Sequence, residues 1–184
     1  MSRFAGPVRQ LGIIVPDLKA EVQNWVNIGV GPWALISEVR FDNFKYRGKP
    51  APGPRVSIAL SYSGPLQLEI IQQHDDVPSA YTEFLAVSPG GIQHVATFAT
   101  SEEDFDRKRQ ALLDQGLVVV HEGNVEGFPQ RFVYCAAPGK AGFPLFEIGE
   151  SDLPALRPMW AKLQELSVAW DGSNPLRPIG EIFG

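Results

Sequence analysis

The stretch GIQHVATF, residues 91–98, decides the fold. Like an earlier stretch, RQLGIIVPDL at 9–18, it has the pattern of a β-strand that begins a unit of similar order. Both are rich in residues that favour β-strands, and each is followed by a helical pattern that opens with a capping residue, Asp17 or Ser101. Three further strand patterns follow each helix. The order β-α-β-β-β therefore occurs twice, which predicts an internal duplication.

Hydrophobic periodicity and turn residues place the other elements. In the first unit we expect a helix that ends near residue 28, and strands at 34–41, 55–62 and 66–73. In the second unit we expect a helix that ends at Gly116, and strands at about 117–122, 130–136 and 143–149. The segment 47–54, rich in Pro and Gly, is expected to be a loop.

The two units define the predicted domain organisation. We expect an α+β protein with one domain at 1–151, built from βαβββ modules at about 8–74 and 90–151. A C-terminal extension at 152–184 follows, with a helix near 155–168 and a Pro-rich tail.

Composition excludes several classes of protein. The 184 residues include 16 basic and 21 acidic side chains, for a net charge of -5, and no basic cluster suggests a nucleic-acid partner. Cys135 is the single cysteine, which excludes an internal disulfide and a multi-cysteine zinc site. No apolar run is long enough to span a membrane, and the N-terminus lacks the apolar core of a signal peptide. We therefore expect a soluble, cytoplasmic protein.

Four strands each carry one long polar side chain on a largely apolar face: Gln10, Glu69, His94 and Glu147. They occupy the first and last strands of the two units, so a pseudo-twofold axis would bring them together. A buried carboxylate needs a partner, and a divalent cation is one that both glutamates can share. This donor set suits Zn²⁺, Ni²⁺, Co²⁺, Mn²⁺ or Fe²⁺.

Other interpretations of these residues stay open. The two glutamates could pair with Arg9 or Arg131 instead of a metal. Gln10 and His94 could be structural residues hydrogen-bonded to the backbone. His121 could form a rival triad with His94 and the second glutamate, although it lies near the end of its strand.

Aromatic side chains are candidates for an apolar substrate pocket, with core packing as the alternative. The candidates are Trp33, Phe132 and Tyr134 first, then Phe44, Tyr46 and Phe128. If several line one pocket, we expect a bulky apolar substrate such as a ring compound or an acyl thioester.

Five motifs resemble the vicinal oxygen chelate superfamily, which includes glyoxalase I, methylmalonyl-CoA epimerase, extradiol dioxygenases and bleomycin-resistance proteins. They are RQLGIIVPDL (9–18), GVGPW (29–33), LQLEIIQ (66–72), GIQHVATF (91–98) and PLFEIGE (144–150). The resemblance covers roughly residues 8–150. It implies paired βαβββ modules that form a cupped mixed sheet around a metal ion, which is the glyoxalase-like fold.

The resemblance also implies a ligand set of Gln10, Glu69, His94 and Glu147 for a divalent metal cofactor. Many members have histidine at the first of these positions, where this chain has glutamine. A Gln–Glu–His–Glu set resembles that of some glyoxalase I enzymes. It departs from the two-histidine, one-carboxylate set of extradiol dioxygenases, which counts against oxygen activation.

The function implied by this resemblance is proton transfer next to a metal-chelated carbonyl of a small-molecule substrate, in an isomerase, epimerase or glyoxalase-type lyase. We expect Glu147 to be the catalytic base and Glu69 to act from the opposite face. The alternatives are a non-catalytic protein that binds a hydrophobic ligand and, less favoured, an extradiol-type dioxygenase. A homodimer and a monomer both remain open, because one chain with both modules can complete its own site.

Overall fold

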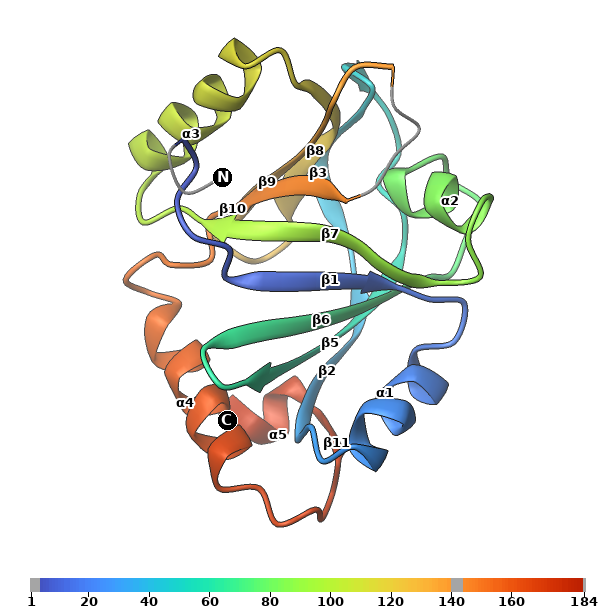
Figure 1. Ribbon diagram of the computed structural model, residues 1–184, viewed down its shortest axis with the longest axis vertical. Coiled ribbons are helices and arrows are strands. Elements are labelled where there is room, and N and C mark those ends of the chain that lie inside the picture. The colour runs from blue at the N-terminus through green and yellow to red at the C-terminus, as the bar shows by residue number, and fades with distance from the viewer. Residues whose placement is uncertain (1–3, 140–143, 184) are drawn as a thin grey trace.

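The structure is a computed structural model that describes residues 4–139 and 144–183 (Figure 1). All of its strands join one eleven-stranded mixed sheet in the order β11-β2-β5-β6-β1-β7-β10-β9-β8-β3-β4. The α+β class and the cupped sheet of two βαβββ modules are therefore confirmed.

The two modules have the same internal order. The first comprises β1 (Gln10–Ile14), α1 (Leu18–Asn27), β2 (Trp33–Val39), β5 (Val56–Ser63) and β6 (Leu66–Gln73). The second comprises β7 (Gly91–Phe98), α3 (Glu102–Asp114), β8 (Val118–Val125), β9 (Arg131–Ala136) and β10 (Leu145–Gly149). The antiparallel pair β1–β7 joins the modules at the centre of the sheet, as Figure 1 shows. In each module the last strand is parallel to the first.

Both module helices begin where the capping residues predict. The Asp17 carboxylate accepts a hydrogen bond from the backbone N–H of Ala20 at 3.0 Å. The Ser101 hydroxyl accepts one from the N–H of Asp104 at 3.1 Å. Each side chain thereby pairs a backbone donor that the first turn of a helix leaves free.

The connection between β2 and β3 (Phe41–Tyr46) forces the sheet to curl. These strands lie near opposite ends of the sheet, yet only Arg40 separates Val39 from Phe41 in the chain. The two ends must therefore approach one another, and the backbone N–H of Glu126 in the β8–β9 loop bonds the Arg40 carbonyl at 2.9 Å. The curled sheet has an inner face, which encloses the site described below.

The helices α1 and α3 cover the outer face of the sheet at opposite ends of the molecule (Figure 1). Leu18 and Val22 of α1 pack on Ile13 and Ile70, while Phe105 of α3 belongs to a second cluster that includes the buried Cys135. These clusters hold the strands through their outer face, so the side chains on the inner face are available for other contacts.

The C-terminal extension folds back over the inner side of the first module. It forms α4 (Arg157–Val168), β11 (Leu176–Pro178) and α5 (Ile179–Phe183). Leu163 and Ile182 are buried against Leu60 and Tyr62 of β5. The helix expected near 155–168 is present, whereas the tail forms a short strand and a short helix that its Pro-rich composition did not predict.

Two further elements lie outside the predicted pattern. The segment expected as a loop at 47–54 contains the short strand β4 (Lys49–Pro50), which pairs with β3. The linker between the modules forms α2 (Ala80–Leu85), which begins at a capping box between Ser79 and Thr82. Within the described residues, no helix combines the length and apolar character needed to cross a membrane.

Candidate metal centre

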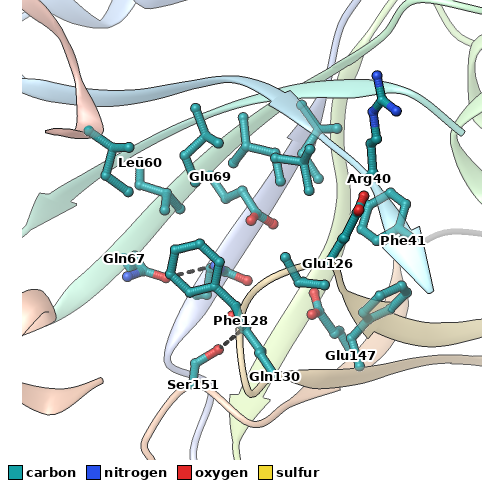
Figure 2. A pocket seen from close by; sticks show the side chains of 18 of the residues that line it. Arg40, Phe41, Leu60, Gln67, Glu69, Glu126, Phe128, Gln130, Glu147 and Ser151 are labelled. Atoms are coloured by element: carbon teal, nitrogen blue, oxygen red, sulfur yellow. Dashed lines mark hydrogen bonds between the residues drawn. The ribbon is translucent and has the colours of Figure 1, made fainter. Parts of the chain in front are cut away.

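Glu69, His94 and Glu147 meet on the inner face of the sheet, where β6, β7 and β10 hold them. Register places Gly12 of β1 between Glu69 and His94, and Glu147 lies beside Ala96 on the next row. His94 Nε2 lies 3.1 Å from Glu147 Oε2 and 3.4 Å from Glu69 Oε2. One atom from each side chain fits within a group no wider than 4.8 Å. Figure 2 shows the two carboxylates pointing into the same space from different strands.

The His94 ring is held by the residue before it. Gln93 Nε2 donates to the carbonyl of Ala80 at 2.8 Å, which leaves its amide oxygen to accept from His94 Nδ1 at 2.8 Å. Nδ1 therefore carries a proton, and Nε2 is the ring nitrogen that faces the two carboxylates. A bulge makes this contact between adjacent residues available, because Gly12 pairs with His94 while Ile13 pairs with Ile92.

This arrangement requires a positive charge between the three side chains. Burial would lower the pKa of His94, but hydrogen bonds and charge from Glu147 and Glu69 raise it to about 9. Burial raises the pKa of Glu69, and the charge of Glu147 adds to the effect. Oε2 of Glu147 is buried and lies 3.1 Å from His94 Nε2. A divalent cation fits this donor set, since it supplies positive charge to both carboxylates and can accept the lone pair of His94.

Gln10 lies on the same inner face and lines the same cavity as the two glutamates. Its Nε2 donates to Gln67 Oε1 at 2.7 Å, and Gln67 Nε2 donates to the Tyr62 hydroxyl at 3.0 Å. These two hydrogen bonds fix the amide of Gln10, so its Oε1 remains available as a ligand atom. The first of these bonds is drawn in Figure 2.

The cluster lies in a cavity with a volume of about 250 Å³. Phe132 and Tyr134 line it, and so do apolar residues of β2 and β5. The Tyr134 hydroxyl lies 3.4 Å from His94 Nε2 and accepts a longer bond from Tyr81 at 3.5 Å. The cavity thus joins a polar end at the cluster to apolar walls, which is the usual character of a small-molecule site.

Trp33, expected in the pocket, lies elsewhere. It is fully buried on the outer face beneath α1, where its ring centroid is 6.3 Å from that of Trp25 and its Nε1 donates to the Val30 carbonyl at 3.0 Å. Alternation explains the difference, because Ile36 of the same strand lines the cavity and Trp33 is an odd number of residues away.

The structure does not assemble the rival arrangements. His121 is fully buried beside Tyr134, with ring centroids 4.3 Å apart, but the only cluster of metal-ligating side chains among the described residues is Glu69, His94 and Glu147. Burial lowers the pKa of His121 to about 3, and neither ring nitrogen has a partner in the described chain. Arg131 pairs with Glu150 at 2.7 Å and Asp106 at 3.0 Å, away from the cluster.

Sequence reasoning missed several residues that shape this site: Gln93, Gln67, Tyr62 and Tyr81. Gln67 has a detectable signal, since it shares a strand face with Glu69 two residues away. Strict alternation would place Gln93 on the face opposite His94, so no pattern predicts their contact. Tyr81 reaches the cavity from α2, an element that the sequence analysis did not expect.

Comparison with known proteins agrees with this fold. A sequence model of the glyoxalase/bleomycin resistance protein/dioxygenase superfamily matches residues 9–134. Methylmalonyl-CoA epimerase from Mycobacterium tuberculosis has a similar structure, with a TM-score of 0.54 and 20% sequence identity over 84% of this chain and 92% of that one. A hypothetical protein from Bacillus halodurans gives a TM-score of 0.50 at 17% identity, over 78% of this chain and 92% of its own.

No curated protein sequence matches the chain. The family match nevertheless spans well over half of its length, and it contains Gln10, Glu69 and His94. The chain belongs to the glyoxalase/bleomycin resistance protein/dioxygenase superfamily.

Proposed function

We propose that this chain is a metal-dependent enzyme that transfers a proton at the carbon next to a carbonyl group of a small substrate. Gln10, Glu69, His94 and Glu147 would hold the metal. The observation that carries the proposal is the orientation of His94, whose Nδ1 is engaged by Gln93 while Nε2 faces two carboxylates at 3.1 and 3.4 Å. A histidine that binds a metal through one ring nitrogen typically donates its other ring N–H to a fixed acceptor, as Nδ1 does here to Gln93.

A divalent cation bound at this site would polarise the carbonyl and stabilise the negative charge that forms when the neighbouring carbon loses a proton. Glu147 and Glu69 supply the proton chemistry from two different strands. We assign Glu147 as the base that removes the proton and Glu69 as the group on the opposite face. The position of Glu69 supports this role, because it reaches the cavity from β6 of the first module, whereas Glu147 comes from β10 of the second.

Two reaction outcomes follow from this pair of carboxylates. Return of the proton to the other face of the same carbon is an epimerisation, and return to the adjacent carbon is an isomerisation. The solved structure named as a methylmalonyl-CoA epimerase makes the first outcome a candidate, at the level of fold alone. A second candidate function, binding of an apolar ligand without catalysis, is favoured by the aromatic and aliphatic walls of the cavity.

The proposal is tested by hydrogen exchange. Cobalt-loaded protein is incubated in D₂O with 2-substituted acyl thioesters and hemithioacetals, and deuterium at the carbon next to the carbonyl is measured by NMR. We expect at least one compound to exchange with wild type and with Glu103→Gln, a matched change in an exposed glutamate on α3. Glu147→Gln should abolish the exchange. Full exchange by metal-loaded Glu147→Gln would contradict the assignment, and binding of the compounds without any exchange would favour the second candidate.

A further inference from the structure

The charges around the cavity limit what kind of substrate it can accept. Five charged residues line it, and four of them are glutamates: Glu38, Glu69, Glu126 and Glu147. The fifth, Arg40, is bound by Glu38 at 2.9 Å. In Figure 2 the guanidinium of Arg40 points away from the carboxylates of the cluster. Glu69 and Glu147 would share the charge of the proposed cation, and Glu38 is paired with Arg40, so the cavity retains the negative charge of Glu126 and offers no unpaired cation within the described residues.

A coenzyme A thioester would suit this wall poorly. Its carrier brings several phosphate groups, and proteins recognise phosphates with arginine, lysine or the N-terminus of a helix. No lysine lines the cavity in the described chain, and its single arginine is already paired. The volume of about 250 Å³ lies just below the range of typical ligand sites, which is roughly 300–1,000 Å³.

The C-terminal extension supplies an apolar wall to the same cavity. Met159 and Trp160 come from α4, and Ile179 comes from α5. These helices are anchored on β5 by Leu163 and Ile182, which are both buried. All of these residues lie beyond β10, the last strand of the second module, so this wall comes from the C-terminal extension and not from the two modules.

Trp160 contributes apolar surface to this wall. The residue lines the cavity, whereas its Nε1 is buried and has no acceptor among the described residues. A buried donor is closed off from the cavity, so the contact that this side chain can make with a ligand is an apolar one.

We propose that the substrate is a compact carbonyl compound without a phosphate-bearing carrier, whose aryl or branched-alkyl body contacts Met159, Trp160 and Ile179. Its chelating oxygens would bind the metal that Glu69 and Glu147 would hold, and this part rests on the proposed function. The extension then determines specificity, because Met159, Trp160 and Ile179 form an apolar wall of the same cavity.

Calorimetry on cobalt-loaded protein tests the proposal with three probes. Acetohydroxamate and benzohydroxamate chelate through the same two oxygens and differ in the phenyl ring, and malonyl-CoA carries the phosphates. We expect benzohydroxamate to bind at least ~10-fold more tightly than acetohydroxamate, since burying a ring contributes that much or more. Malonyl-CoA should bind more weakly than benzohydroxamate at low salt.

Variants locate the ring-binding wall. Trp160→Leu should remove most of the advantage of benzohydroxamate and leave acetohydroxamate unchanged, and Trp160→Phe should retain part of it. Trp25→Leu, in α1 on the outer face of the sheet, is the control and should behave like wild type. Tighter binding of malonyl-CoA, or an unchanged advantage in Trp160→Leu, would overturn the proposal. Failure to bind cobalt would reject only the proposed function, and the wall is then tested with acetophenone, whose binding must still fall in Trp160→Leu.

Discussion

A β-carbon on Gly12 would lie 1.7 Å from Cε1 of His94, so the imidazole occupies space that exists only because residue 12 has no side chain. Gly12 is paired with Glu69 on one side and with His94 on the other. The glycine on the central strand thus lets the histidine ring lie across the sheet surface towards the carboxylates. Backbone freedom is not the reason for this glycine, because its φ lies outside the left-handed region.

Gly12→Ala should therefore displace His94 and remove the metal site. We expect a loss of about 1–3 kcal/mol in the free energy of unfolding, since the added methyl group meets a ring in a packed strand pair. Metal bound per chain, measured by mass spectrometry after dialysis, should fall well below that of wild type. Gly180→Ala is the matched control, because a β-carbon there meets nothing within 4 Å. Wild-type metal content in Gly12→Ala would show that His94 is not a ligand in the orientation described.

Gln93 should tune the metal affinity without touching the metal. Gln93→Leu removes the acceptor for His94 Nδ1, so the ring loses its fixed tautomer and orientation. We expect the dissociation constant for Co²⁺ to rise by roughly 10–100-fold, which is the usual effect of removing a residue that hydrogen-bonds a metal ligand. Competition with a chromophoric chelator measures it. Thr97→Val on the same strand, where the hydroxyl donates to the Ala5 carbonyl, should leave the constant unchanged, and equal constants for both variants would argue against the role of Gln93.

Gln10 should contribute less than His94 to the affinity of the protein for Co²⁺. In Gln10→Ala one neutral oxygen ligand is lost, and water can take its place. We expect a rise of about tenfold, which corresponds to roughly 1.4 kcal/mol. Chelator competition on Gln10→Ala and Gln164→Ala, a surface glutamine that bonds the Gly64 carbonyl, provides the comparison. If Gln10→Ala binds cobalt as tightly as the surface variant, Gln10 is a structural residue bonded to Gln67.

His121 should make the protein sensitive to acid. Its pKa of about 3 in the folded state lies below that of an unfolded histidine, so the unfolded chain binds more protons between the two values. Stability therefore falls as the pH drops below about 6.5, by up to ~1.4 kcal/mol per pH unit.

His121→Leu should lose this sensitivity. Between pH 7 and pH 5 we expect wild type to lose about 2 kcal/mol more than the variant, measured by urea unfolding of metal-free protein. His74→Leu, an exposed loop histidine, controls for histidine titration in general. Parallel stability curves for wild type and His121→Leu would show that His121 is not buried as a neutral ring.

The sequence predicts the modules and the cluster for the same physical reason, which is burial. Glu69, His94 and Glu147 stand out because each is a polar residue in an otherwise apolar strand. This difference can be recognised in one strand without knowing which strands lie beside it. Contacts that depend on irregular backbone have no such signal. Gln93 reaches His94 through a bulge, and Trp33 lies one residue out of phase with the inner face of β2.

The pairing of strands between the two modules cannot be predicted from the sequence either. β3 pairs with β8 of the other module, and Tyr46 lies opposite His121 although 75 positions separate them. The apolar wall of the cavity depends on how α4 and α5 fold back, which follows from Leu163 and Ile182 only once β5 is in place. Pattern and propensity describe local structure, whereas these contacts arise from tertiary packing.

Metal content tests the central claim most directly, by mass spectrometry on protein purified without a metal-affinity tag. Wild type should hold close to one equivalent of a transition metal per chain, and His94→Ala and Glu147→Gln should lose most of it while remaining folded. A wild-type protein that contains no metal, takes up none from Co²⁺ or Zn²⁺ in dialysis, and is as stable as both variants would contradict the account.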